Sequence, residues 1–212
     1  MSRKYAVTSP EEAKFLQSYD ADKYKKASFT VDVAVYAKDA DGLWLLLIER
    51  GGFPAKGQLA LPGGFLNMDE ELHEAAAREL FEETGVSNIP LVQCYTMGGI
   101  GRDPRDRVLT GLYTAVIDKS AVSPKAGDDA KSAFWFRLCR HETAPEFRGG
   151  VNAMRHILEF SNGSMEIKID GAAVSGFAPP HQSDIVIHSS ENIAFDHDEE
   201  IMRSLLMVEP WL

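Results

Sequence analysis

The chain has 212 residues, of which 44% are hydrophobic and 25% are charged, values typical of one soluble globular domain with a sizeable core. Its formal charge of -10 at pH 7 repels nucleic-acid phosphates and anionic lipid, which disfavours a DNA-binding or membrane-binding protein. The longest apolar run, Leu43–Ile48, is too short to cross a bilayer, and the N-terminus carries no signal-like apolar segment. We therefore expect a cytoplasmic protein.

The first part of the chain predicts a short helix followed by a β-hairpin. A polar helix is expected over Pro10–Tyr19. Ser28–Ala37 alternates with a period of two and is rich in β-branched residues, which predicts a strand. Turn-forming residues 39–42 then lead into a second apolar strand, Leu43–Arg50, and the two strands are expected to pair as a hairpin.

The longest predicted helix, Asp69–Thr84, follows a loop rich in Gly and Pro. Strong helix formers fill it, and Asn67 as N-cap with Glu70 three residues later resembles a capping box. Gly85 is placed to end the helix, because glycine readily adopts the left-handed conformation of a C-cap.

The second half of the chain predicts strands, an irregular segment and a closing helix. We read residues 1–212 as a single domain in which residues 140–190 form an inserted subdomain before the C-terminal helix. A short helix at Val151–Phe160 and two strands at Met165–Asp170 and Asp184–His188 are predicted inside this insertion. The other predicted elements are strands at Leu91–Met97, Arg107–Ile117 and Ser132–Leu138, and an acidic helix at Asp196–Met207.

One face of the long helix carries the carboxylates of Glu79, Glu82 and Glu83. At about 100° per residue, Glu79 and Glu83 lie one turn apart and Glu82 lies beside them. Like charges at this spacing repel one another, so the cluster destabilises the helix unless a cation lies against it. Mg²⁺ prefers oxygen ligands and is often shared between carboxylates and substrate phosphates. The alternative interpretation is a solvated acidic face.

The spacing of residues 64–86 resembles the Nudix box of the Nudix hydrolase superfamily at every defined position. The matching positions are Gly64, Glu70, Arg78, Glu79, Leu80, Glu82, Glu83, Gly85 and Val86. The resemblance implies that Arg78 orients the carboxylates and that Glu70 braces this arrangement; for Arg78, a plain surface salt bridge is the alternative. The implied metal ligands are Gly63 (through its carbonyl), Glu79, Glu82 and Glu83, and the implied catalytic residues are Glu70, Arg78, Glu82 and Glu83.

The Nudix resemblance implies a fold and a reaction. The fold is an α/β/α sandwich around a mixed sheet, onto which Leu80, Ala77 and Phe81 are expected to dock the box helix. The reaction is Mg²⁺-dependent hydrolysis of a nucleoside diphosphate linked to another moiety, with Mn²⁺ as a possible substitute. Segments such as FTVDVAVY, GRDPRDRV and NIAFDHDEEIM resemble the ADP-ribose pyrophosphatase-like branch. That branch implies cleavage of ADP-ribose to AMP and ribose 5-phosphate, and a homodimer.

Basic residues outside the box are candidates for substrate binding in an otherwise acidic chain. Arg102, Arg105 and Arg107 lie close together in GRDPRDR, and their guanidinium groups suit phosphate. Alternatively, these arginines pair with the interleaved Asp103 and Asp106. Two further candidates, Arg50 for a phosphate and Phe53 for a base, lie beside a glycine pair; ordinary loop packing is the alternative for each.

The general base has more than one candidate. Asp128 and Asp129 precede a predicted strand in a region where Nudix enzymes often carry an extra acidic residue, although turn chemistry explains such a pair equally well. Glu82 is an equal candidate, since neighbouring carboxylates titrate as a coupled set.

The cysteines and histidines show no pattern of a metal site. Cys94 and Cys139 lie in strand-like apolar segments and are predicted to be buried thiols. His73, on the box helix, lies away from the carboxylate face and is read as structural. The remaining histidines, which lack ligand spacing, are His141, His156, His181, His188 and His197.

Two alternatives to an ADP-ribose hydrolase remain. Some relatives of this branch join a Nudix-like domain to a DNA-binding domain under the control of ADP-ribose, and such a sensor needs a basic C-terminal surface. Residues 138–212 carry twelve acidic and five basic residues, which speaks against DNA. The second alternative is an enzyme acting on nucleotide sugars, dinucleoside polyphosphates or oxidised nucleoside triphosphates. In either enzymatic reading the partner is a small nucleotide, not nucleic acid or membrane.

Overall fold

The computed structural model describes the chain except residues 1–4, 126–129, 144, 149–150, 175–184 and 212. Its centre is a mixed eleven-stranded sheet with the order β11-β10-β9-β7-β2-β1-β6-β5. The strands on this path are β1 (Ser28–Asp39), β2 (Gly42–Arg50), β5 (Val92–Met97), β6 (Val108–Asp118), β7 (Ala130–Glu142), β9 (Val151–Ser161), β10 (Glu166–Val174) and β11 (Ile185–Ser190). Off the path, β3 (Leu59–Ala60), β4 (Gly63–Phe65) and β8 (Glu146–Arg148) pair with β2, β1 and β9.

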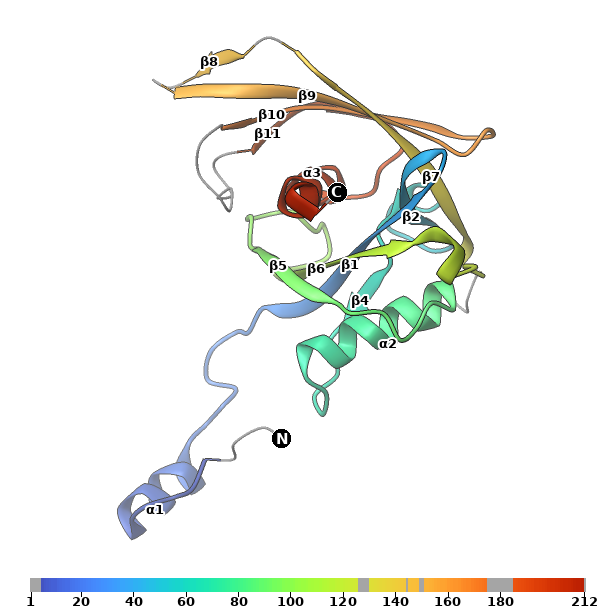
Figure 1. Ribbon diagram of the computed structural model, residues 1–212. Coiled ribbons are helices and arrows are strands. Elements are labelled where there is room, and N and C mark those ends of the chain that lie inside the picture. Colours follow the sequence, from blue (N-terminus) through green and yellow to red (C-terminus); the bar gives the residue numbers. More distant parts are fainter. Residues whose placement is uncertain (1–4, 126–129, 144, 149–150, 175–184, 212) are drawn as a thin grey trace.

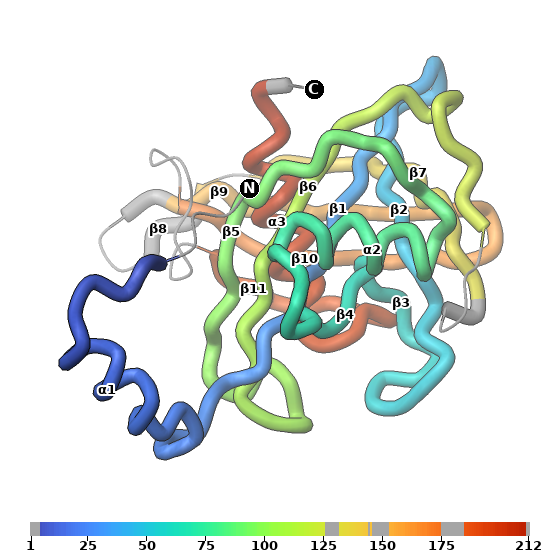
Figure 2. The backbone as a smooth tube through the Cα atoms, turned by 90° about the horizontal axis from the view of Figure 1, so that it is seen from below, coloured from blue at the N-terminus to red at the C-terminus, as the bar shows by residue number. Residues whose placement is uncertain are grey.

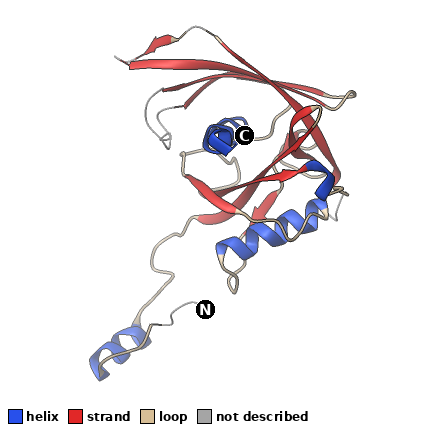
Figure 3. Ribbon diagram, in the orientation of Figure 1, coloured by secondary structure: helices blue, strands red, loops and turns tan. Residues whose placement is uncertain are grey.

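The sheet curls so that its two ends face each other across helix α3 (His197–Val208), as Figures 1 and 3 show. The core inside the curl combines side chains of the central strands, such as Tyr36 and Phe136, with Phe160 of β9 and Leu205 of α3. The Tyr36 hydroxyl donates a hydrogen bond to the Ile201 carbonyl at 3.0 Å and so ties β1 to α3. The C-terminal helix is therefore an internal part of the fold.

Helix α2 (Leu72–Thr84) covers the opposite face of the sheet and contacts β1 and β4 (Figure 2). A second core there contains Val31, Val33 and Leu46 of the sheet together with Leu80 of α2. Strand β1 thus has a core on each face, which explains why it is buried along most of its length rather than alternating between core and solvent. The mixed sheet between helical layers confirms the predicted α/β class.

Residues 140–190, predicted to be an insertion, differ from their predicted secondary structure at one element. Residues Val151–Ser161 form strand β9 and not a helix, so the predicted helix at Val151–Phe160 is wrong. His156, Leu158 and Phe160 are buried at every second position, which is a strand period. The two strands predicted nearby are present as β10 and β11. Together these strands extend the central sheet beyond β7.

Helix α2 begins three residues later than predicted. Its N-cap is Glu71, whose backbone N–H donates to Glu74 Oε2 at 2.9 Å. Asn67 is therefore not the cap, although its N–H does donate to Glu70 Oε1 at 2.7 Å in the preceding turn. Gly85 ends the helix with φ of 68°, as expected.

The docking face of α2 is also shifted from its prediction. Ala75, Ala76, Leu80 and Thr84 are the buried residues, whereas Ala77 and Phe81, which were expected to dock, are exposed. A fixed glycine at the C-cap does not specify how the helix is rotated about its axis, and contact with the two-sided strand β1 selects the smaller alanine face.

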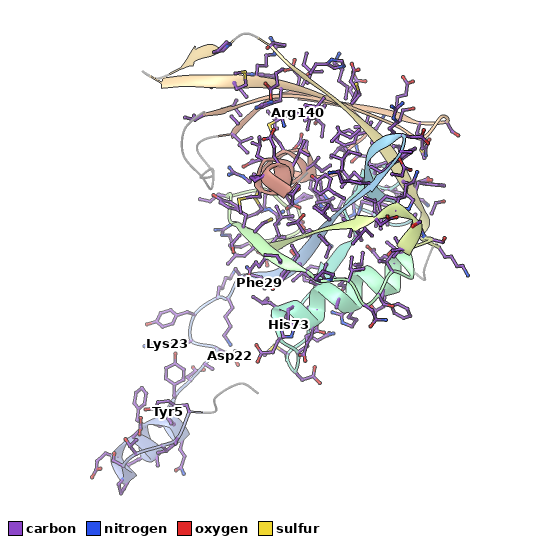
Figure 4. The ribbon with its side chains drawn as sticks, viewed as in Figure 1. Tyr5, Asp22, Lys23, Phe29, His73 and Arg140 are labelled. Atoms are coloured by element: carbon purple, nitrogen blue, oxygen red, sulfur yellow. The ribbon has the colours of Figure 1, made fainter. Side chains whose placement is uncertain are left out.

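Helix α1 (Pro10–Ser18) lies apart from the body of the molecule, as Figures 1 and 4 show, and none of its residues is buried. Two short 3₁₀ helices, η1 (Lys119–Ala121) and η3 (Glu209–Trp211), complete the described elements. Of the two cysteines, Cys94 is half-buried and Cys139 is exposed, so the prediction of buried thiols is wrong for Cys139. Within the described ranges, no helix is both long and apolar enough to cross a membrane.

Candidate active site

A cleft of about 770 Å³ lies where α2 meets the sheet. It is lined by β1, the end of β2 and the loop after it, β4, α2, the loop before β6 and the segment before α3. These parts are distant in sequence, and the curl of the sheet brings them together. Four of the matched box positions line the cleft, namely Gly64, Arg78, Glu79 and Glu83, together with Gly63 and Asn67.

Arg78 organises the box carboxylates. Its Nε and Nη2 donate to the two oxygens of Glu70 at 2.9 and 2.6 Å, and its Nη1 donates to Glu79 at 2.7 Å and Glu82 at 3.0 Å. Nη2 also donates to the Phe65 carbonyl at 3.0 Å. The pairing with Arg78 lowers the pKa of Glu70 to about 2. One guanidinium therefore fixes three carboxylates at once, which exceeds a plain surface salt bridge.

Glu83 is the most enclosed of the box carboxylates. Its Oε2 accepts the Gly63 N–H at 2.9 Å, and burial raises its pKa to about 8. Burial also raises the pKa of Glu79, against the opposing effect of Arg78. Two half-buried carboxylates that resist ionisation need a compensating cation, and hard oxygen donors are what Mg²⁺ or Mn²⁺ prefers. The donor set therefore fits a divalent metal.

Two glycines bring the backbone against these carboxylates. A Cβ on Gly64 would lie 2.5 Å from the carboxylate of Glu79. A Cβ on Gly63 would lie 2.3 Å from the Val31 carbonyl oxygen and from Asp32 Oδ1. A side chain at either position would displace one of these groups: the flexible Glu79 carboxylate at Gly64, or backbone of β1 at Gly63.

The fold places four of the five substrate-binding candidates at the cleft. Arg50, Phe53, Arg102 and Arg105 line the cleft. Arg107 is not among the lining residues, and its guanidinium donates to the Gly98 and Gly99 carbonyls at 2.8 and 2.9 Å. The expected pairing with interleaved aspartates occurs at Arg105, whose Nη2 is 2.6 Å from Asp103.

Arg102 is committed to a buried network beneath the cleft. It donates to both oxygens of Asp196 at 2.7 and 2.8 Å, to Glu200 Oε1 at 2.6 Å and to Thr110 Oγ1 at 2.6 Å. Its side chain is 7% exposed and that of Glu200 is fully buried. Glu200 Oε2 has no hydrogen-bond partner within the described part of the chain. This network explains the arginine without any ligand.

Sequence reasoning missed a polar cluster at the floor of the cleft. Ligand atoms of Asp32, His197 and Glu200 all lie within 4.8 Å of one another. Burial raises the pKa of Asp32 to about 7 and lowers that of His197 to about 3. Because His197 Nδ1 accepts the Leu61 N–H at 2.9 Å, the neutral ring carries its proton on Nε2 and offers a donor here. A charged residue inside an apolar strand, as in TVDVAV, is the signal that could have identified Asp32.

Other predicted residues lie elsewhere. Asp128 and Asp129 fall outside the described residues. His73 is exposed near the beginning of α2 (Figure 4) and does not line the cleft. Phe195, which no sequence pattern singled out, lines the cleft from the segment before α3.

Two named proteins share part of this sequence. The chain is 38% identical over 117 residues to the ADPR responsive transcriptional repressor NtrR of Acinetobacter baylyi, covering 54% of this chain and 47% of that protein. It is 43% identical over 96 residues to the ADP-ribose pyrophosphatase of Methanocaldococcus jannaschii, covering 44% of this chain and 54% of that protein. The chain therefore spans about half the length of each of these relatives.

Solved structures and a family model agree on the fold. A MutT/nudix family protein from Enterococcus faecalis superimposes with a TM-score of 0.73 at 31% identity, covering 96% of this chain and 70% of that chain. The NUDIX domain of Shewanella oneidensis NrtR, complexed with ADP ribose, gives a TM-score of 0.55 at 31% identity over 58% of this chain and 81% of that chain. The NUDIX domain model matches residues 28–157, which include the box and most of the cleft. The chain belongs to the Nudix family.

Proposed function

We propose that the protein is a Mg²⁺-dependent pyrophosphohydrolase that cleaves ADP-ribose to AMP and ribose 5-phosphate. The observation that carries this proposal is the carboxylate set on α2 around Arg78, of which Glu79 and Glu83 line a cleft that also presents Arg50 and Arg105. The pyrophosphatase relative supports the substrate, since its name states that activity.

In this proposal the box residues hold the metal. Glu79, Glu82, Glu83 and the Gly63 carbonyl are the ligands, and Mn²⁺ can replace Mg²⁺. When bound there, a divalent ion would neutralise phosphate oxygens and supply an activated water at near-neutral pH. Arg78 keeps the carboxylates in place, and Glu70 holds Arg78 by its two-pronged hydrogen bond.

Other residues at the cleft bind the substrate in this proposal, and a box carboxylate accepts the proton. Arg50 and Arg105 provide guanidinium groups for the diphosphate, and Phe53, which is 86% exposed at the cleft, provides a face for a base. Because Arg102 and Arg107 are already bound to protein acceptors, they support the cleft walls in this proposal instead of contacting substrate. A box carboxylate serves as the base, with Glu82 the most exposed of the three.

A sensor that binds ADP-ribose without cleaving it is the second candidate. The NtrR relative and the ADP-ribose complex of the NrtR domain favour it. The C-terminal part of this chain argues against DNA binding, because α3 is enclosed by the sheet and residues 138–212 are acidic. A recognition helix needs an exposed, basic face.

Product formation from a substrate panel tests the proposal. ADP-ribose, nucleotide sugars, diadenosine polyphosphates and oxidised nucleoside triphosphates are compared with Mg²⁺, using wild type, Glu83→Gln and the control Glu166→Gln on the exposed side of β10. We expect ADP-ribose to be turned over best, with loss of about a hundredfold or more in Glu83→Gln only. Wild type that binds ADP-ribose but cleaves nothing would replace the hydrolase with the sensor. The implied homodimer is tested by the molecular mass in solution.

A further inference from the structure

The segment between β11 and α3 holds an aromatic residue in a backbone conformation that such residues avoid. Phe195 has φ of 52°, in the left-handed region, and Asn192 in the same segment has φ of 61°. Asparagine tolerates this region, but for phenylalanine it is strained, and strain of this kind persists where the surroundings fix the residue for a function.

The surroundings of Phe195 do fix it. The Leu59 N–H donates to the Asn192 carbonyl and the Ala194 N–H donates to the Leu59 carbonyl, both at 2.9 Å. On the other side of Phe195, the His197 ring accepts the Leu61 N–H at 2.9 Å. Ala194 and His197 are both buried. The chain on both sides of Phe195 is thus tied to β3 and to the residue that follows it, Leu61.

Two arginines that line the cleft lie close to the ring. The Arg50 guanidinium carbon is 4.9 Å from the centre of the Phe195 ring, and that of Arg105 is 5.8 Å from it. Arg105 also lies 5.1 Å from the ring centre of Phe65 on β4. Guanidinium groups at these distances are attracted to the ring faces, so both side chains are restrained by the same phenylalanine.

The two guanidinium groups differ in their protein partners. Asp103 binds Nε and Nη2 of Arg105. Arg50 donates to the Pro54 carbonyl at 3.1 Å, and in the described part of the chain no carboxylate forms an ion pair with it. Burial, and then the neighbouring Arg105, lower the pKa of Arg50, against the opposing effect of the carboxylates of Glu83, Asp32 and Asp103. A guanidinium that lines the cleft without an ion pair, beside a second guanidinium, favours an added anion.

We propose that Phe195 is a positioning residue that holds Arg50 and Arg105 as a paired clamp for the diphosphate of a nucleotide substrate. The clamp rests on the proposed function for its substrate and adds to it the residue that sets the spacing of the two cations. Phe195 contacts the arginines and not the diphosphate. The aromatic ring is the essential part, because an aliphatic side chain of similar size has no π-face to attract a guanidinium.

The test compares Phe195→Leu, Phe195→Tyr and Arg50→Met with wild type, using Phe81→Leu on the exposed side of α2 as the matched control. Calorimetry gives the Kd for ADP-ribose and for inorganic pyrophosphate with Mg²⁺, and steady-state kinetics give kcat and KM. We expect Phe195→Leu to raise Kd and KM about tenfold with little change in kcat, and Phe195→Tyr to restore both. In the Arg50→Met background, Phe195→Leu should add less than it does alone. Melting temperatures identify any variant that fails to fold.

The outcomes separate the clamp from the reaction. Hydrolysis of ADP-ribose that is unchanged in Phe195→Leu, or effects of Phe195→Leu and Arg50→Met that simply add, would overturn the clamp and leave the proposed function standing. Pyrophosphate binding that depends on both residues in a protein that cleaves nothing would support the clamp and overturn the hydrolase. A fall in kcat at constant KM would also reject positioning of a substrate anion.

Discussion

At the scale of single residues, alanine substitutions at two adjacent glycines are expected to affect different properties, activity at Gly64 and stability at Gly63. We expect Gly64→Ala to lower kcat about tenfold or more and to weaken Mg²⁺ activation, with little change in melting temperature. The new Cβ would lie 2.5 Å from the Glu79 carboxylate, the movable end of a long side chain, so that carboxylate shifts and the fold remains. Activity at varied Mg²⁺ and thermal melting measure the two effects.

Gly63→Ala is the comparison variant. Its Cβ would lie 2.3 Å from the backbone oxygen of Val31 in the centre of the sheet, which cannot move without disturbing β1. We expect a loss of about 1–3 kcal/mol in the free energy of unfolding, as for overpacked cores. Equal loss of stability in both variants would show that Glu79 cannot move aside and would reject the separation.

At this scale, the sequence predicts what is local. Glu79, Glu82, Glu83 and Arg78 could be assigned to one site because helical spacing alone brings them together. Asp32, Phe195 and His197 could not, because they meet only after the sheet has curled and brought β1 beside the start of α3. The same limit applies to Arg102, whose partners Asp196 and Glu200 belong to the far end of the chain.

Among the elements, regular patterns predict strands and helices better than they predict ends and faces. The hairpin of β1 and β2 follows from alternation and turn chemistry, and the structure shows that pairing. In β9, helix-forming residues such as Ala153, Met154 and Leu158 mask the period of two, and pairing with β7 and β10 decides in favour of a strand. Tertiary contacts therefore override local propensity in this segment.

The network at the beginning of α3 gives a prediction about the stability of that element. In Arg102→Met, Asp196 and Glu200 lose the guanidinium that they share, and Glu200 has no access to water. We expect the free energy of unfolding to fall by about 3–5 kcal/mol, measured by urea denaturation, because a buried carboxyl is left without its partner. Adding Glu200→Met should recover part of this loss.

The Arg102→Met variant also distinguishes a structural role of Arg102 from a role in substrate binding. If Arg102 is structural, Arg102→Met lowers the free energy of unfolding, while the KM for ADP-ribose changes little in the folded protein. A KM that rises strongly in Arg102→Met, with unfolding free energy preserved, would return Arg102 to the substrate-binding residues and contradict the network. Arg107→Met, which removes hydrogen bonds to two exposed loop carbonyls, serves as the control and should cost far less stability.

For the whole molecule, the curl of the sheet makes the cleft and the core parts of one arrangement. α3 is packed inside the curl, and its first residue, His197, is hydrogen-bonded to the strand segment that leads into the box. The cleft floor also contains Asp32 and, behind it, Glu200, whose pKa values are raised by burial while that of His197 is lowered. Lowering the pH therefore has opposite effects on stability at this junction: protonation of Asp32 and Glu200 favours the folded state, whereas protonation of His197 favours the unfolded state.

The opposing directions lead to a prediction for stability against pH. The pKa of His197 is about 3 in the fold, compared with about 6.5 in the unfolded chain, so below pH 6.5 the unfolded state binds a proton that the native state refuses. The stabilisation is complete above pH 6.5 and is lost as the pH falls toward 3.

Asp32 and Glu200 act the other way, but they are present in both proteins when wild type is compared with His197→Asn, whose amide oxygen can accept the Leu61 N–H. We expect His197→Asn to gain stability relative to wild type by about 1.4 kcal/mol per pH unit between pH 6 and 4, measured by urea denaturation at each pH. His73→Asn, on the exposed start of α2, should follow wild type. A constant difference between His197→Asn and wild type across this range would mean that His197 can take up a proton in the fold, and that the junction opens more easily than its burial indicates.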